Sequence, residues 1–302
     1  MKSKLRLVAV LLLMTIGSVF SVAILKEGVK NPTGPTLAPA FQLLGTIPKH
    51  ADRMVGRLLP INEIDEGKLG NILAARYQRQ ANIHDPAYIY INDLLTNLGK
   101  YTNRKLNYRA FILNSTSPNA MALPGGVVLI TRGLLTALRS EAELVAVLAH
   151  EIGHIEQGHC FDGVKFELLA RKIGAPTLGK IADFTTSLLL RHSFSKTQEH
   201  ESDEYSYTLL LNSPYDPRGT GMAFASLQNR HPSSKKSLQP FRDYFSSHPP
   251  LALRSAAYTE RAINWWRRNP GERRYVGKQN LKEQKSYFLP VQYAGEWIKN
   301  PR

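Results

Sequence analysis

The chain contains the pattern H-E-x-x-H at residues 150–154, with His150, Glu151 and His154 at the specified positions. On an α-helix, two residues that are four apart differ by about 40° in rotation, so both imidazoles project from one side and can bind one ion. Glu151 would lie beside them, where it can activate a water molecule on the metal without being a ligand. The pattern therefore requires a helix through this segment, and it favours metal-dependent hydrolysis.

The residues before the motif predict where this helix begins. Ser140 is a typical N-cap, and Glu143 three positions later completes a capping box before an apolar run. Further upstream, two β-prone runs at residues 108–113 and 127–131 are separated by a loop that contains prolines and two consecutive glycines. These signals predict two strands, followed by the helix that carries the motif.

The second β-prone run is a candidate for substrate binding. If residues 127–131 form an edge strand beside the motif helix, an extended peptide can add to it by main-chain hydrogen bonds. The interpretation rests on the loop of Gly125 and Gly126, and it places the substrate along Val127 and Val128. This interpretation predicts that the protein has only a weak preference for the amino-acid sequence of its substrate. The alternative is an ordinary internal strand.

A catalytic zinc ion takes three protein ligands and a water, so the sequence must offer one more ligand. His159 follows His154 by five residues, whereas an extended three-histidine motif places its last histidine after six. Glu199 and Asp203 are one helical turn apart on one face, so Glu199 would bind the metal while Asp203 orients a ligand histidine. Glu201 lies on a different face and loses that pairing. Glu199 is therefore the preferred third ligand, and Glu201 is the alternative.

The chain carries a formal net charge of +15, from 39 lysine and arginine residues against 24 aspartate and glutamate residues. Such a charge favours anionic partners without choosing among nucleic acid, lipid headgroups and acidic proteins. The basic residues are spread out, with a mild concentration at residues 254–302, and no basic run alternates with aromatic residues along one element. We therefore expect a solvated basic surface and no nucleic-acid partner; lipid or nucleic-acid binding through residues 254–302 is the less favoured alternative.

The first 25 residues have the pattern of an export signal. Basic residues precede an uncharged apolar stretch at residues 7–25, and Ser21 and Ala23 suit a cleavage site. The stretch is also close to the roughly 20 residues that span a bilayer, so a cleaved signal peptide and an uncleaved anchor both remain open. Residues 26–60 are rich in proline and glycine, as in a linker. We expect an exported protein, periplasmic or anchored facing the periplasm, that associates with the membrane surface.

Several separated motifs together resemble a known family. They are residues 150–154, the pair Glu199-x-x-x-Asp203 with its lead-in at residues 193–196, and the stretch N-A-M-A-L-P-G-G at residues 119–126. In their order along the chain, these motifs are similar to those of the membrane-associated zinc metalloendopeptidases that include HtpX, the CaaX prenyl proteases, the mitochondrial Oma-type enzymes and the periplasmic BepA and LoiP. The resemblance runs from about residue 66 to residue 254.

The resemblance implies an α+β fold that is mostly helical, a zincin-like metalloprotease domain with a small β-sheet beside the motif helix. It implies one Zn²⁺ per chain, held by His150, His154 and Glu199, with Glu151 as the general base. The later stretch S-H-P-P-L-A-L-R looks like the family's late His-Pro motif, which would put His248 near the metal. There His248 would either stabilise the oxyanion or occupy the open coordination position as a brake.

The chain departs from this family in two ways. We expect it to lack the several transmembrane helices of the HtpX and prenyl-protease branches and the long repeat domain of BepA, and to be a compact form closer to LoiP but without its lipid attachment. We predict a zinc metalloendopeptidase domain at residues 61–260, with a basic C-terminal extension at residues 261–302, that acts on unfolded or misassembled envelope proteins. The alternative is a non-catalytic, chaperone-like or partner-binding protein with a shut, structural zinc site.

Overall fold

The computed structural model describes residues 63–164, 185–186, 194–228, 248, 251–288 and 292–299. The predicted export segment and the linker lie outside the described residues. The chain divides into two compact units, Met1–Pro60 and Ile61–Arg302, and every described residue belongs to the second. Among the described residues, no helix is both long enough and apolar enough to cross a membrane.

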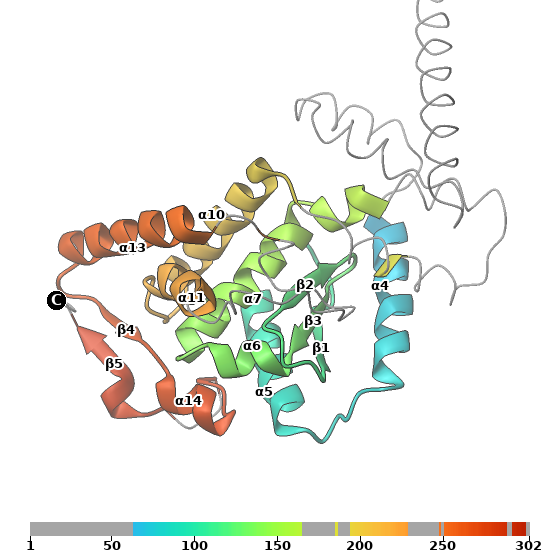
Figure 1. Cartoon of the computed structure of the whole chain (residues 1–302), viewed down its shortest axis with the longest axis horizontal. Helices are drawn as coiled ribbons and strands as arrows, with labels where there is room; N and C mark the ends of the chain where they lie inside the picture. The colour runs from blue at the N-terminus through green and yellow to red at the C-terminus, as the bar shows by residue number, and fades with distance from the viewer. Residues whose placement is uncertain are drawn as a thin grey trace, which may run out of the picture. The chain divides into compact units, whose positions relative to one another are not determined.

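A small mixed sheet lies next to the helix that carries the H-E-x-x-H motif (Figure 1). Its strands β1 (Arg109–Leu113), β2 (Ala120–Leu123) and β3 (Val127–Thr131) have the order β1-β3-β2. β3 runs parallel to β1 and antiparallel to β2. The turn between β2 and β3 uses Gly125 and Gly126 at positive φ, which glycine adopts at little cost. The mostly helical domain with this sheet confirms the predicted fold class.

β3 is the central strand, so the prediction of an edge strand at residues 127–131 is wrong. Both of its sides are paired, because Val128 lies opposite Ala110 of β1 and opposite Ala122 of β2. All of its residues are buried, as expected for a continuous apolar run that is covered on both faces. The residues expected to bind substrate instead form a turn and an internal strand: Gly125, Gly126, Val127 and Val128. The edge strand that contacts the motif helix is β2.

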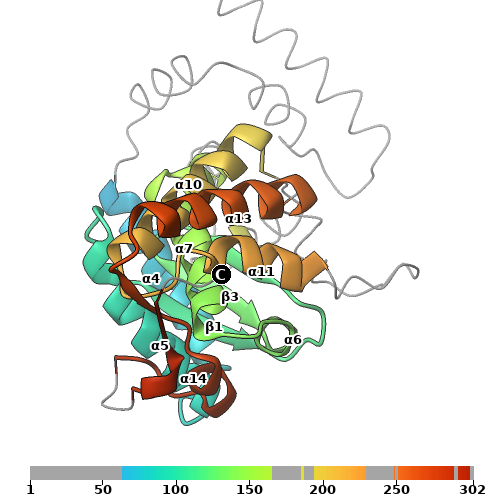
Figure 2. The same ribbon diagram turned by 90° about the vertical axis from the view of Figure 1, so that its left-hand side faces the viewer.

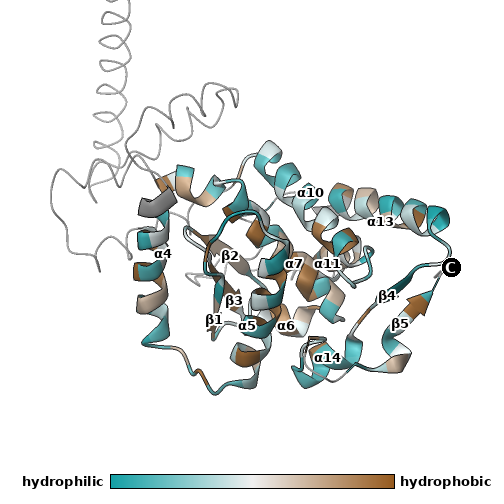
Figure 3. Ribbon diagram, turned by 180° about the vertical axis from the view of Figure 1, so that it is seen from behind, coloured by the Kyte–Doolittle hydropathy of each residue, from teal (hydrophilic) through white to brown (hydrophobic). Residues whose placement is uncertain are grey.

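The motif helix, α7 (Glu141–Glu156), runs through the centre of the domain. α10 (Lys196–Asn212) packs along it, and α11 (Gly219–Gln228) packs against both α7 and α13 (Leu251–Arg268), as Figures 1 and 2 show. The remaining helices and strands are α4 (Glu63–Gln78), α5 (Pro86–Leu98), η1 (Gly99–Tyr101), α6 (Arg132–Ala137), β4 (Arg273–Tyr275), α14 (Lys278–Glu283), η2 (Ala294–Glu296) and β5 (Trp297–Lys299). Residues 141–155 of α7 are all buried, and Figure 3 shows hydrophobic residues along α7 and in the three-stranded sheet. This packing fixes the position of the motif.

α7 begins at the residue that the sequence predicts. Ser140 is the N-cap, and its hydroxyl accepts a hydrogen bond from the N–H of Glu143 at 3.3 Å. The Glu143 carboxylate reaches back one residue beyond the cap and accepts from the N–H of Arg139 at 3.0 Å. Two main-chain donors at the helix start are thereby satisfied by side chains, which defines where the helix begins.

The described C-terminal residues pack into the same core as the rest of the domain. α13 continues through that position, and Tyr275 is fully buried in the main hydrophobic cluster. The first N–H groups of α7, on Glu141 and Ala142, donate to the carbonyls of residues 277 and 276 at 2.9 and 3.0 Å. The basic composition of the segment reflects its exposed side chains, whereas its apolar side chains complete the core and its backbone caps α7.

Candidate metal centre

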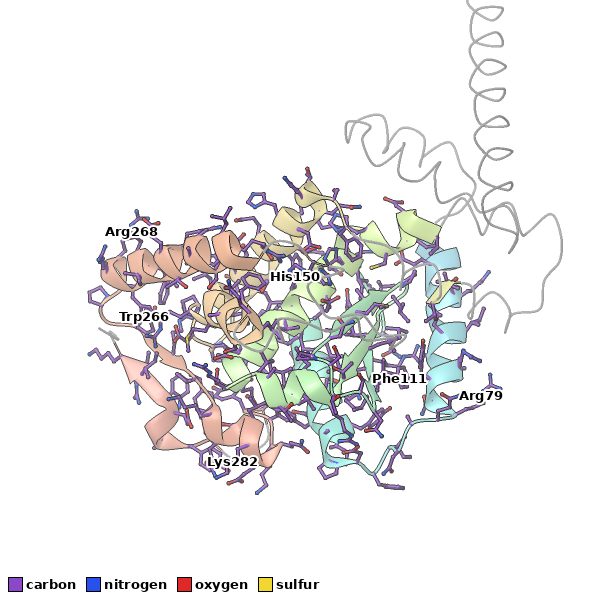
Figure 4. The ribbon with its side chains drawn as sticks, in the orientation of Figure 1. Arg79, Phe111, His150, Trp266, Arg268 and Lys282 are labelled. Carbon is purple, nitrogen blue, oxygen red and sulfur yellow. The ribbon has the colours of Figure 1, made fainter. Side chains whose placement is uncertain are left out.

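Four buried side chains from three segments of the chain meet at one point, and we call them the metal group. His150 and His154 come from α7, Glu199 from the first turn of α10, and His248 from the segment before α13. Their ligand atoms all lie within 4.8 Å of one another, and each side chain is at most 2% exposed. Figure 4 shows His150 in the interior of the domain, whereas Arg268 lies at its periphery. The structure thus brings together every residue that the sequence placed at the metal.

The spacing of these atoms fits a tetrahedral zinc ion. His154 Nε2 lies 3.1 Å from His150 Nε2, and His248 Nδ1 lies 3.3 Å from the same His150 atom. Glu199 Oε1 lies 2.8 Å from His248 Nδ1 and 3.5 Å from His154 Nε2. Zinc bonds of about 2.0–2.1 Å in a tetrahedral site place neighbouring ligand atoms about 3.3 Å apart. Three nitrogens and one carboxylate oxygen therefore fit zinc in type and number, and these four separations lie close to the spacing that zinc requires.

The charges of His154 and Glu199 suit a cation. Burial lowers the pKa of His154 well below its usual range, so its imidazole is neutral and can offer a lone pair. Burial alone would raise the pKa of Glu199, but His248, His154 and His150 outweigh burial and lower that pKa. Burial alone would lower the pKa of His248, but the carboxylates of Glu199 and Glu151 outweigh burial and raise that pKa. For His154 and Glu199, a neutral imidazole beside an ionised carboxylate is the state that binds metal, whereas the raised pKa of His248 favours its charged form, which has no lone pair for a metal.

Asp203 lies behind His150, on the side away from the metal group. Its Oδ1 is 2.9 Å from His150 Nδ1, and its side chain is 1% exposed. α10 produces this position because Asp203 follows Glu199 by one helical turn, so one helix supplies both carboxylates. With Nδ1 engaged by a carboxylate, the Nε2 lone pair of His150 is directed at the metal group.

Arg254 completes the site, although the sequence motifs did not predict a role for it. Its guanidinium donates to both oxygens of Asp203, from Nε at 2.7 Å and from Nη2 at 2.6 Å. Its Nη1 lies 2.8 Å from Glu199 Oε2. Two carboxylates buried one turn apart need a compensating cation, and Arg254 ends the same short stretch that contains His248. These two signals together could have identified it.

Glu151 faces the metal group from α7 and is fully buried. Its Oε2 accepts a hydrogen bond from the N–H of Ala122 on β2 at 2.8 Å. Its Oε1 makes no hydrogen bond within the described part of the chain and lies 3.6 Å from His248 Nε2. The edge of the sheet therefore holds one carboxylate oxygen and leaves the other available to a small polar molecule.

The weaker ligand candidates, His159 and Glu201, lie outside the metal group. His159 Nδ1 is 3.1 Å from His154 Nδ1, whereas it is Nε2 of His154 that faces the group. Glu201 Oε2 lies 3.0 Å from His159 Nε2. Neither side chain is therefore among the candidate ligands: His159 contacts His154 on the side away from the metal group, and Glu201 contacts His159.

Comparison with known proteins gives a consistent picture. The sequence model of peptidase family M48 matches residues 90–262, which are more than half of the chain and contain the whole metal group. The mitochondrial metalloendopeptidase OMA1 of Arabidopsis thaliana is 29% identical over 154 residues, covering 50% of this chain and 30% of that protein. The metalloprotease LoiP of Escherichia coli (strain K12) is 28% identical over 172 residues, covering 50% of this chain and 67% of that protein. The beta-barrel assembly-enhancing protease of the same organism is 28% identical over 203 residues, covering 60% of this chain and 41% of that protein. The chain thus matches less than half the length of two of these relatives.

Proposed function

Because the chain belongs to peptidase family M48, we propose that it is a zinc-dependent endopeptidase in which His150, His154 and Glu199 hold the metal and Glu151 is the general base. The observation that carries this proposal is the metal group, buried in the domain core with the spacing of a tetrahedral zinc site. Zinc supplies a Lewis acid that polarises the scissile carbonyl and lowers the pKa of water at the site toward 7.

The side chains around the metal group have separate roles in the proposed reaction. Glu151 accepts the proton of the attacking water through Oε1 and returns it to the leaving amine, while the Ala122 N–H holds Oε2 in place. Asp203 keeps Nε2 of His150 directed at the group, and Arg254 holds Asp203. Burial of these groups excludes bulk water, which strengthens their electrostatic effects on developing charge.

His248 is proposed as a brake on this site. Its Nδ1 lies 2.8 Å from Glu199 Oε1 and 3.3 Å from His150 Nε2, so His248 would be a fourth protein ligand if the group held zinc. A site closed by four protein ligands is structural, whereas a catalytic site keeps one position open. Cleavage then requires His248 to move out of the metal group. This favours an inhibitory role for His248, as a brake, over the alternative role as a hydrogen-bond donor to the oxyanion.

His248→Ala is expected to raise the rate of cleavage of an unfolded protein by roughly tenfold, the gain that follows if the open form is about a tenth of the molecules. The comparison uses initial rates on casein for the wild type, for His248→Ala and for His84→Ala, an exposed histidine on another surface that should change nothing. A fall in rate for His248→Ala with zinc retained would contradict the brake and favour the oxyanion donor.

The substrates proposed are unfolded or misassembled proteins of the cell envelope. The predicted export segment supports this location, as does the similarity to the beta-barrel assembly-enhancing protease of Escherichia coli. The net charge of +15 supports association with an anionic membrane surface. A quality-control protease must select its substrates by their lack of structure, so extended segments should be cleaved and folded proteins spared.

Metal removal tests the function directly. The purified chain should contain close to one zinc per molecule and should cleave unfolded casein, and a chelator should abolish cleavage until zinc is restored. A natively folded protein of similar size should resist under the same conditions. Zinc at full occupancy with no cleavage by the wild type or by His248→Ala would instead support the non-catalytic, partner-binding alternative. Equal cleavage of folded and unfolded proteins would refute the quality-control role.

A further inference from the structure

A second histidine supports His154 from behind. His159 Nδ1 lies 3.1 Å from His154 Nδ1, and on its other side His159 Nε2 lies 3.0 Å from Glu201 Oε2. His159 is only 6% exposed, although it lies beyond the end of α7. Glu201, His159 and His154 therefore form a series in which each side chain contacts the next. The series ends at Nδ1 of His154, the nitrogen that faces away from the metal group.

A single arrangement of protons satisfies this series when His154 binds a metal. Nε2 of His154 then offers its lone pair, so Nδ1 carries the proton and donates to His159 Nδ1. In the neutral ring of His159 the proton therefore sits on Nε2, where it donates to the Glu201 carboxylate. Every contact in the series has one donor and one acceptor, and no additional proton is needed.

The turn after α7 creates this contact. α7 ends at Glu156, and Gly158 follows with a φ of 78°, a left-handed conformation that residues with a side chain adopt at a cost. The N–H of Asp162 then donates to the carbonyl of Gly158 at 2.9 Å as helical structure resumes. This change of direction returns His159 to the last turns of α7. The five-residue spacing after His154 thus reaches the far nitrogen of that ligand instead of the metal.

We propose that His159, held by Glu201, is a positioning residue for His154 that raises the zinc affinity of the site. The inference rests on the proposed function, because it requires His154 to be a zinc ligand. An acceptor behind a ligand histidine fixes its tautomer and ring direction, and losing such a partner weakens metal binding by about 10- to 100-fold. His150 has a carboxylate in direct contact, Asp203 at 2.9 Å, whereas His154 reaches its carboxylate through the imidazole of His159.

Packing alone does not account for this arrangement. The ring of Phe194 stacks on His154 with centroids 3.8 Å apart, so an aromatic contact already restrains the plane of the ligand ring. Phe194 has no polar atom and cannot determine which nitrogen of His154 carries the proton. His159 supplies that determination, which is why its effect should be seen in metal affinity and not only in stability.

The test measures the zinc dissociation constant of the purified chain by competition with a chromogenic chelator, together with the melting temperature of each zinc-free form. His159→Phe keeps the aromatic volume but removes the acceptor, so zinc should bind about 10- to 100-fold more weakly. His159→Asn places an amide oxygen near the position of Nδ1 and should restore most of the affinity. Glu201→Gln should weaken binding in the presence of His159 but add nothing to His159→Phe, because the two act as one unit.

His200→Gln is the matched control, since His200 neighbours Glu201 on α10 but is exposed and should leave zinc affinity unchanged. A wild type that binds no zinc would refute the proposed function itself. A wild type that binds zinc, with affinity unchanged in His159→Phe and Glu201→Gln, would overturn the positioning role even if the zinc-free variants melt at lower temperature. If His159→Phe does not fold, His159→Asn and Glu201→Gln still decide the question through the same measurement.

Discussion

Glu151→Gln is expected to lower the rate of peptide hydrolysis by about 10³-fold, within the usual range for loss of a general base, while leaving zinc content near the wild-type value. The amide has almost the shape of the carboxylate, and its oxygen can still accept the N–H of Ala122, which donates to Glu151 at 2.8 Å. What the amide loses is the ability to take a proton at the atom that faces the metal group. The measurement is kcat on a quenched fluorescent peptide, with zinc determined on the same samples.

The control for this substitution is Glu260→Gln, an exposed glutamate on α13 that should leave both activity and zinc unchanged. Loss of zinc from Glu151→Gln would mean that this carboxylate is a ligand. Retention of more than about a tenth of the wild-type rate would mean that another group takes the proton. Either result would require the roles of the buried carboxylates to be reassigned, because Glu151 is fully buried and faces the metal group.

The local parts of the site could be predicted from the sequence. The helical period alone directs His150 and His154 toward one point, and it places Asp203 one turn after Glu199 on a second helix. These relations join residues that are four apart, whose relative positions are fixed as soon as a helix forms. The cap at Ser140 is of the same kind, since it depends on a residue three positions later.

The features of the fold and the site that depend on contacts between residues far apart in the sequence could not be predicted from local spacing. Whether β3 is central or at an edge depends on the strands that pair with it, and its continuous apolar run was the one available signal for burial on both faces. Arg254 is separated from Asp203 by 51 positions, so its role required the two segments to be brought together. The position of His159 depends on the positive φ angle of Gly158, and the spacing of residues in the sequence does not reveal the sign of a φ angle.

Arg254→Ala is expected to lower the free energy of unfolding of the zinc-free chain by about 3 kcal/mol, the low end of the range for breaking a buried ion pair. The Arg254 side chain is 11% exposed and contacts both Asp203 and Glu199, whose side chains are 1% and 2% exposed. A buried ion pair as a whole contributes little, because desolvation offsets its attraction. Removing the cation alone is different, since two carboxylates are left in the interior without their counter-charge. Urea denaturation at pH 7 in the presence of a chelator measures the effect.

Two further variants identify what Arg254 contributes. Arg254→Lys keeps the charge but cannot donate to both oxygens of Asp203 at once, so it should lose an intermediate amount of stability. Arg268→Ala removes an exposed arginine from the end of the same helix and should change stability by no more than about 0.5 kcal/mol. If Arg254→Ala loses as little as Arg268→Ala, the two carboxylates do not depend on this cation. The metal group would then have to be stabilised by its own histidines, of which His248 lies 2.8 Å from Glu199.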